Sequence, residues 1–274
     1  MENAKLKACV YRSSQKIAIV RSENTLVRDT SYKLLMFLVL IGIWQLTAMH
    51  FDLALIMPYP LVTFKSLIDC MTDIETIKNI MITMDRVLRG FLWALFIGAP
   101  LGFLMGAFPF VQKLIGGFID SIRQVPIMAW VPLTIVWFGI GNGPTIFIIA
   151  LSGIFPIILN TVSAVQNIDK DYYYAAKSMG ARPISLFFNV MLPAAIPDIL
   201  TGARIAISAG WMSVIWAEYI ATSAGLGYSM VEAQTRMQTE RLIALMIFAA
   251  LVGFMIDRGL QIINKSLTKW RYIS

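Results

Sequence analysis

Three chemically distinct side chains share one spacing in an otherwise apolar stretch of the chain. Arg204, Trp211 and Glu218 follow one another at intervals of seven residues. Seven residues are close to two turns of an α-helix, so a helix presents all three on one face. Ionisable groups at membrane depth are costly and normally face protein or a watery cavity. This face therefore predicts either the lining of a translocation path, with Arg204 attracting an anion, or a set of structural contacts.

The two alternatives are weighed differently for the two charged residues. For Arg204 we favour pairing with a carboxylate such as Asp257, at the inner end of the last apolar stretch, or snorkelling of its side chain. For Glu218, packing at an outer gate and structural pairing are equal hypotheses. Arg86 and Arg89 stand at the mouth of an earlier apolar stretch, where we expect them to snorkel toward water.

A second group of candidates combines prolines with tryptophans. Pro126 and Pro132 each lack a backbone donor, and Pro132 is expected to bend the helix that contains it. Trp130 and Trp137 are seven residues apart and so share a helix face. Two hypotheses explain these four residues equally well. One is a kinked pathway helix with an aromatic wall, and the other is that the tryptophans lie at the lipid interface or pack between helices.

Covalent chemistry has few candidates in this sequence. The one histidine, His50, ends an apolar run and reads as an interfacial residue, and the two cysteines have no metal-ligand spacing. We therefore predict no catalytic residue, no metal site and no enzyme activity. A Gly-rich phosphate loop of the G-x-x-x-x-G-K-[ST] type is also missing from the sequence. The chain is expected to bind no cofactor, and any ATP it uses must be bound by a partner.

The composition identifies the elements that must position these residues. Of the 274 residues, 58% are hydrophobic and 14% are charged, and the mean hydropathy is +0.70. A soluble domain is usually about 25% charged. The apolar runs are continuous, whereas barrel strands alternate. These features predict an all-α integral membrane protein. The net charge of +7 fits basic cytoplasmic segments better than nucleic-acid binding.

The order of apolar stretches predicts six spans. A polar N-terminal arm over 1–33 precedes a transmembrane domain over 34–270, and residues 124 to 168 contain no charged residue, which is enough for two spans. Sixteen Lys and Arg residues fall on the side of the termini and six on the other, so both termini are predicted to be cytoplasmic. The predicted spans are 34–50, 88–110, 124–140, 144–165, 198–218 and 241–260.

The stretch YYYAAKSMGARPISLFFNVMLPAA at 172–195 is too polar to be a span, and its pattern is that of two short helices. Asp169 suits a helix start, and Gly180 suits the left-handed position just after a helix end. Pro183 suits the first turn of a second helix, which Leu192 and Pro193 are expected to close. The prediction is a helical hairpin over 169–191. From the residues alone it is as easily a plain linker between spans as a functional element.

The same stretch resembles the cytoplasmic signature of permease subunits in binding-protein-dependent ABC importers. That signature is E-A-A, three residues, G, nine residues and I-x-L-P. Tyr174 and Val190 stand where the family usually has Glu and Ile. VPIMAWVPLTIVWFGIG at 125–141, residues 192–218 and SAGLGY at 223–228 resemble the nitrate, sulfonate and taurine branch. The resemblance implies that the ATPase-coupling residues are Tyr174, Ala175, Ala176, Gly180, Ala181, Leu192 and Pro193.

The resemblance implies the type I ABC importer permease fold, with the hairpin forming coupling helices. It implies two ABC ATPase subunits that carry ATP and Mg, an extracytoplasmic solute-binding protein, a second copy of the permease and a prokaryotic plasma membrane. The solute is expected to be small and anionic or zwitterionic, such as taurine, another sulfonate or nitrate. The alternative is a self-sufficient, ion-coupled secondary transporter. Such carriers often have internal repeats and paired broken helices, which are not evident here.

Overall fold

The computed structural model describes residues 31–51, 53 and 55–268, and within them the chain is helical with no strand. The predicted arm over 1–33 lies almost wholly outside these residues, as does the end of the chain after 268. The chain divides into two units, 1–64 and 65–274. The first contributes a helix over Ser31–Phe51. The indole Nε1 of Trp44 donates to the carbonyl of Pro58 at 3.1 Å, which ties this helix to the segment that follows it.

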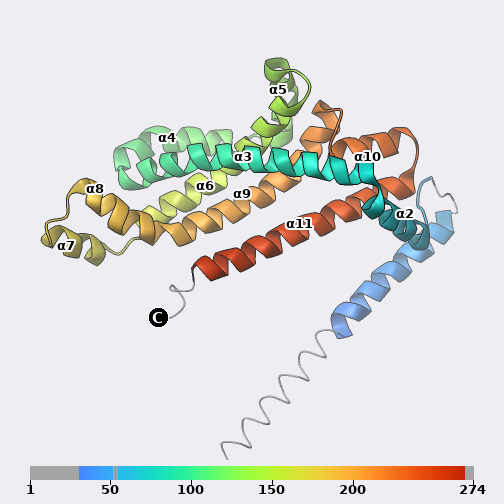
Figure 1. The fold of residues 1–274 in the computed structure, drawn as a ribbon, viewed down its shortest axis with the longest axis horizontal. Helices are drawn as coiled ribbons and strands as arrows, with labels where there is room; N and C mark the ends of the chain where they lie inside the picture. The colour runs from blue at the N-terminus through green and yellow to red at the C-terminus, as the bar shows by residue number, and fades with distance from the viewer. Residues whose placement is uncertain (1–30, 52, 54, 269–274) are drawn as a thin grey trace, which may run out of the picture. The chain divides into compact units, whose positions relative to one another are not determined.

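The helices after residue 59 are separated by short breaks (Figure 1). In chain order they are α2 (Pro60–Thr72), α3 (Ile74–Ala107), α4 (Pro109–Ile122), the 3₁₀ turn η1 (Ile127–Trp130), α5 (Val131–Phe138), α6 (Asn142–Gln166), α7 (Lys170–Ser178), α8 (Pro183–Leu186), the π-helical turn η2 (Phe187–Met191), α9 (Leu192–Ala221), α10 (Leu226–Thr235) and α11 (Thr239–Leu267).

The centre of the second unit is the packing of α3, α6 and α9. The glycines of α3 face α6 so closely that a methyl group at Gly98 would contact Ile157, one at Gly102 would overlap Thr161, and one at Gly106 would overlap Val165. The four-residue spacing is the same on both helices, so one ridge of small residues lies along one ridge of larger ones. Such small residues allow helix backbones to approach in a membrane.

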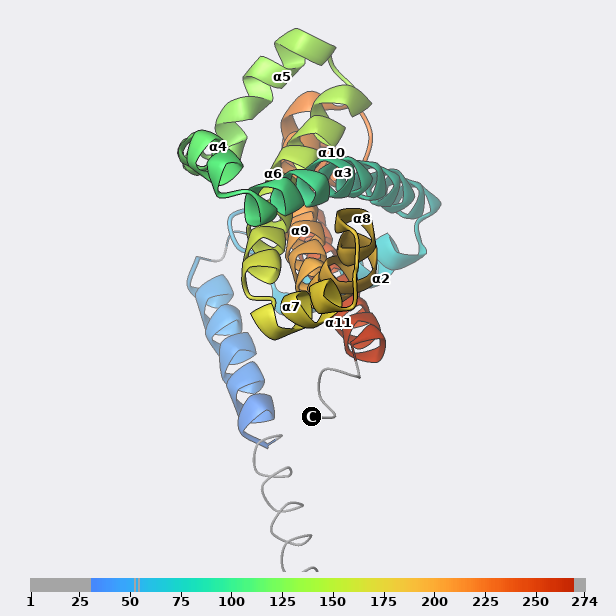
Figure 2. The ribbon, with the colours of Figure 1, turned by 90° about the vertical axis from the view of Figure 1, so that its left-hand side faces the viewer.

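The two ends of this core carry different elements. The hairpin made by α7 and α8 lies at the end where α3 and α6 finish and α9 begins, and α10 lies at the other end (Figures 1 and 2). A cluster of Phe103, Val165 and Ala195, with Phe187 against it, joins the three core helices to the hairpin. The hairpin therefore stands on the core, and a movement of one end of these helices moves the hairpin too.

Five of the described helices are long and apolar enough to cross a membrane. They are Ser31–Phe51, α3, α6, the run Pro183–Ala221 and α11, and a sixth arises if the bent pair formed by α4 and 127–138 counts as one broken span. The chain is thus a multi-pass helical membrane protein. Helix α3 has 34 residues, about 51 Å in length, and begins well before the predicted span at 88–110.

The segment predicted as a kinked span over 124–140 is helical over 127–138. Residues 127–138 are bent by 89° from α4, and α5 itself has eight residues, far fewer than a crossing requires. Pro126 and Pro132 explain the break, because each removes a donor where a continuous helix would need one. Between the predicted spans at 88–110 and 124–140 the chain forms helix α4, with Pro109 in its first turn.

Candidate functional site

The hairpin at 169–191 closes its first helix as the sequence predicts. Asp169 caps α7, since its carboxylate accepts from the backbone N–H of Asp171 at 2.9 Å. Gly180 has φ +81°, the left-handed conformation. Its N–H donates to the carbonyl of Lys177, and the N–H of Ala181 donates to that of Ala176. This pair of bonds is the Schellman arrangement, and it fixes the angle at which the chain leaves α7.

The second half of the hairpin differs from the prediction. Leu192 and Pro193 do not close it, because the chain continues through η2 directly into α9. The backbone N–H of Leu192 reaches back to the carbonyl of Phe187, the wider spacing of a π turn. Pro193 falls in the first turn of α9, and its missing N–H coincides with this irregular turn. The hairpin is therefore joined rigidly to the start of α9.

Helix α7 buries none of its residues in the isolated chain. Tyr174 is 59% exposed, and Ala175 beside it is also exposed. Helix α7 is therefore a short, largely exposed helix whose angle to the rest of the hairpin is fixed by a left-handed glycine.

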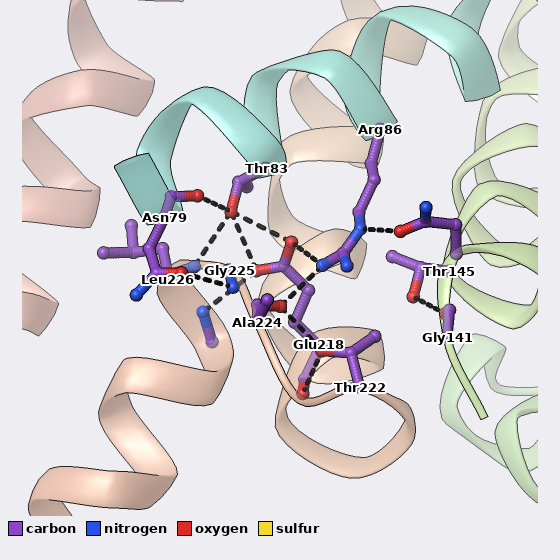
Figure 3. Close-up of polar contacts among 12 residues, drawn as sticks. Asn79, Thr83, Arg86, Gly141, Thr145, Glu218, Thr222, Ala224, Gly225 and Leu226 are labelled. Atoms are coloured by element: carbon purple, nitrogen blue, oxygen red, sulfur yellow. Dashed lines mark hydrogen bonds and ion pairs between the residues drawn. The ribbon is translucent and has the colours of Figure 1, made fainter. Parts of the chain in front are cut away.

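The deepest polar group of the second unit lies at the opposite end, around Glu218 (Figure 3). Its carboxylate accepts from Nη1 of Arg86 at 2.7 Å, from Oγ1 of Thr83 at 2.9 Å and from the backbone N–H of Gly227 at 3.0 Å. Both charged side chains are buried: the Glu218 side chain is fully buried, and the Arg86 side chain is 5% exposed. A buried ion pair of this kind depends on every remaining donor and acceptor being satisfied.

The remaining polar atoms of this group join four helices. Arg86 on α3 also donates to Oδ1 of Asn142 at the start of α6, at 2.8 Å, and to the carbonyl of Ala224 at 2.7 Å. Thr83 accepts from the N–H of Leu226 at 2.9 Å. The group therefore fixes the turn between α9 and α10 against α3 and α6.

Glycine is required in that turn at position 225. Gly225 has φ +111°, which L side chains rarely adopt, and a methyl group there would overlap the Glu218 carboxylate. Its N–H donates to Oδ1 of Asn79 at 2.9 Å, and Nδ2 of Asn79 donates to Oγ of Ser229 at 2.8 Å. In the segment SAGLGY, Gly225 is thus required by the close approach of this carboxylate, and Gly227 by the close approach of α9, where a methyl group would overlap the carbonyl of Ile215.

Of the two hypotheses for Glu218, the structure contains the pairing, and the partner is Arg86. The expectation that Arg86 snorkels is wrong, because its guanidinium lies inside the protein. Arg89, one helical turn on, is exposed and pairs with Asp85 at 2.9 Å. The sequence signal that points to Arg86 is weak, because it is a basic residue at the mouth of one apolar stretch, whereas Glu218 lies in another stretch, 132 residues further along the chain.

The pairing favoured for Arg204 is present. Its Nε donates to Oδ1 of Asp257 at 2.8 Å and its Nη2 donates to Oδ2 at 3.2 Å, a two-pronged contact between α9 and α11. The two side chains are 34% and 37% exposed in the isolated chain. This pair is therefore partly open, whereas the pair of Glu218 with Arg86 is closed.

Trp211 does not line an open space in this chain. It is 7% exposed, its Nε1 donates to the carbonyl of Ala249 at 3.2 Å, and Gly253 on α11 leaves room for the indole. The face shared by Arg204, Trp211 and Glu218 exists as predicted, and the first two members hold α9 to α11.

The residues of the broken segment are not brought together. Trp130 packs with Val131, Ile148 and Ala217. Trp137 is 53% exposed and lies edge-on to Phe147. Pro126 precedes η1 and Pro132 stands in the first turn of α5. The four candidates thus mark a break between helices, and the single aromatic wall expected from their spacing is not formed.

The fold and these features define a class, that of multi-pass helical membrane proteins that carry an exposed helical hairpin on a helical core. Comparison with known proteins gives the family. Residues 90–269 match the model of the binding-protein-dependent transport system inner membrane component. The chain belongs to this family of ABC transporter permease subunits, whose members are transport subunits and not enzymes.

Individual relatives agree with the family. An ABC transporter permease protein of Methanocaldococcus jannaschii is 37% identical over 84% of this chain and 88% of its own length. The taurine transport system permease protein TauC of Escherichia coli is 32% identical over 70% of each chain. The nitrate import permease protein NrtB of Leptolyngbya laminosa is 32% identical over 81% of each.

A solved structure gives the same fold. The chain is similar to a chain of the inward-facing MetNI methionine ABC transporter, with a TM-score of 0.62, 18% identity and coverage of 70% of this chain and 95% of that one. The predicted type I importer permease fold is thereby confirmed.

Proposed function

We propose that this chain is the permease subunit of an ATP-driven importer for a small anionic or zwitterionic solute, with a sulfonate such as taurine, or nitrate, as the first candidates. The relatives named for taurine and nitrate transport support this class of solute. The observation that carries the proposal is the α7–α8 hairpin, which is unburied along α7 and joined rigidly to the core helices.

In this proposal two ATPase subunits, which bind ATP and Mg, dock on the hairpins of two permease copies. Tyr174, Ala175, Ala176, Gly180 and Ala181 form the docking element, and Leu192 and Pro193 pass its movement to α9. Closure of the ATPases moves one end of the core and rocks the helices between inward-open and outward-open states. A ligand shifts an equilibrium only by its differential affinity, so ATP and partner binding must supply this free energy.

The bias of basic residues supports a topology in which the termini and the hairpin are cytoplasmic in a prokaryotic inner membrane. A solute-binding protein then delivers the solute from the other side, where α10 and the buried group around Glu218 lie. Arg204, one-third exposed, is the best candidate to meet an anion in the path. Pro126, Trp130, Pro132, Trp137, Trp211 and Glu218 are proposed to shape the path or gate from behind it.

Reconstitution tests this function. The chain is placed in proteoliposomes with and without its ATPase and binding protein, and uptake of labelled taurine or nitrate is measured with ATP on the ATPase side. Uptake that needs all three components and ATP supports the proposal. Uptake by the purified chain alone, driven by an ion gradient, contradicts it and establishes the secondary-transporter alternative, which the family membership does not favour.

A further inference from the structure

A groove of about 520 Å³ separates the hairpin from the end of α3. Apolar side chains form most of its lining, among them Leu104 of α3, Phe108 just after α3, and Phe187 of the hairpin. The polar groups of the lining come from Tyr173 and Lys177, both on α7. Its volume is within the range of small-molecule sites, roughly 300–1,000 Å³.

The α3 side of this groove lacks a cover in the isolated chain. Leu104 is 48% exposed and Phe108 is 56% exposed. Both residues belong to the end of an apolar helix that is long enough to cross a membrane. The predicted span over 88–110 ends here, and on that prediction this end of α3 lies at the boundary between hydrocarbon and headgroups, where acyl chains cover apolar surface.

The α7 side of the groove carries an uncompensated positive charge. The ammonium of Lys177 lies 5.6 Å from the centre of the Tyr173 ring, and among the described residues no carboxylate forms an ion pair with it. Lysine and tyrosine are residue types that sit at headgroup level with an apolar body and a polar tip. The groove thus pairs an apolar floor with one cationic group.

The neighbouring motif residues do not use this face of α7. Tyr173 and Lys177 are four residues apart and share one side of the helix, whereas Tyr174 and Ala175 project from other sides. A partner that docks on Tyr174 and Ala175 therefore leaves Tyr173 and Lys177 free, and Ala181 is the one residue shared by the docking element and the groove lining. A small inorganic anion would satisfy Lys177 and leave the apolar lining uncovered.

We propose that this groove binds a phospholipid with an anionic headgroup, its phosphate at Lys177 and an acyl chain against Leu104, Phe108 and Phe187. The lipid fills the space between the hairpin and α3 and so stiffens the connection through which the hairpin moves the core. Its placement on the cytoplasmic leaflet rests on the topology in the proposed function, while the binding itself does not.

Native mass spectrometry of the full-length, delipidated chain tests the proposal. Dioleoyl phosphatidylglycerol and dioleoyl phosphatidylcholine, which share their acyl chains, are titrated in separate samples. Removing one lysine charge near a membrane surface is worth about a fivefold change in binding. We expect Lys177→Gln to weaken phosphatidylglycerol binding about fivefold and phosphatidylcholine binding less, because the choline ammonium already neutralises that phosphate. Lys177→Arg is expected to restore the wild-type value.

Lys113→Gln is the matched control, because Lys113 is an exposed lysine on α4 outside the groove. Equal weakening by Lys113→Gln and Lys177→Gln would mean that only the general surface charge attracts lipid, and it would overturn the proposal. Equal binding of the two lipids by the wild-type chain would overturn it as well. Leu104→Trp, which fills the groove, is expected to reduce binding of both lipids while the thermal unfolding temperature stays near that of the wild type.

A protein occupant is detected separately. In the assembled complex, a phosphatidylglycerol with a photoreactive acyl chain is expected to label peptides that contain 103–108 or 183–191. If Leu104→Cys cross-links to a second permease copy or to the ATPase and no lipid labelling is seen, a protein and not a lipid occupies the groove, and the proposal is rejected. Co-purification of the ATPase with Lys177→Gln separates these results from a failure of the proposed function.

Discussion

The carboxylate of Glu218 and the guanidinium of Arg86, which are 132 residues apart in the chain, meet at 2.7 Å inside the protein. Neither residue would be tolerated at this depth alone. Together with Thr83 and the backbone of Gly227 they bind the turn after α9 to the first half of α3. The end of the core opposite the hairpin is therefore held by a polar group, whereas the hairpin end is held by apolar contacts.

Breaking this pair from one side is expected to be severe. Arg86→Met leaves the Glu218 carboxylate buried without its cation, and such changes cost about 3–5 kcal/mol. The measurement is thermal or denaturant unfolding of the purified chain in detergent. Arg89→Met is the control, because the pair of Arg89 with Asp85 is exposed. The double variant Arg86→Met with Glu218→Met is expected to be more stable than Arg86→Met alone, and strictly additive losses would contradict a coupled pair.

The turn at Gly225 gives a second test of the same group. Gly225→Ala combines an unfavourable φ with overlap of the Glu218 carboxylate, so we expect a loss of stability of at least 1–2 kcal/mol. Gly259→Ala in α11 is the matched change, since a methyl group there meets no atom within 4 Å. It should be neutral or stabilising, as Ala is the better helix former. Equal effects of the two substitutions would mean that the turn can relax.

The pair of Arg204 with Asp257 is expected to respond to charge exchange. Asp257→Lys should weaken assembly and transport by placing two cations together on α9 and α11, and the exchanged variant Arg204→Asp with Asp257→Arg should recover most of the loss. Polar contacts between membrane helices are worth about 0.6–1.7 kcal/mol in double-mutant cycles. Full transport by Asp257→Lys would show that the pairing is dispensable. Recovered stability without recovered uptake would assign Arg204 a direct role in the path.

A pH effect is expected at the start of α3. Asp73 caps this helix, and a hydrogen bond from Thr76, with support from the backbone and from Arg241, lowers the pKa of its carboxyl. A carboxyl with a lowered folded-state pKa contributes stability above its unfolded value, about 3.9, and loses it as the pH falls through the folded value.

The matching variant is Asp73→Ala, since loss of a helix cap costs about 1 kcal/mol. Unfolding temperatures are compared with those of the wild type at several pH values. The difference in unfolding temperature between the wild type and Asp73→Ala should stay constant from pH 7 to pH 5 and become smaller below about pH 4. A gap that does not depend on pH would remove the ionised carboxylate from the explanation.

Local sequence patterns predict much of this fold. Helix α6 lies within two residues of the predicted span at 144–165, and Gly180 ends α7 through the expected left-handed position. Both features depend on neighbouring residues only, namely apolar run length and cap chemistry. The contact of Arg204 with Asp257 is also predictable, although the two residues are distant in the chain, because few carboxylates are available to a cation at that depth.

Features that depend on distant parts of the chain are not predicted. Arg86 is the partner of Glu218 because the glycine ridge of α3 brings that helix against α6, and no periodicity within α9 contains this information. The 89° turn between α4 and residues 127–138 is not predicted either, for a related reason. The length of an uncharged run can be read from the sequence, but the direction of the helices within it cannot. Here that direction depends on Pro126, Pro132 and the packing of Trp130.

The central claim is that the α7–α8 hairpin is the element on which the ATPase acts. In a chain with Cys9→Ser and Cys70→Ala, a photoreactive maleimide is attached to Ala176→Cys and, as the control, to Gly116→Cys on α4. The assembled complex is then illuminated with and without ATP. We predict that the probe at 176 cross-links to the ATPase subunit, that the yield changes with ATP, and that the probe at 116 does not cross-link to it. Cross-links from 176 to the permease alone, in a complex that retains its ATPase, would contradict the account.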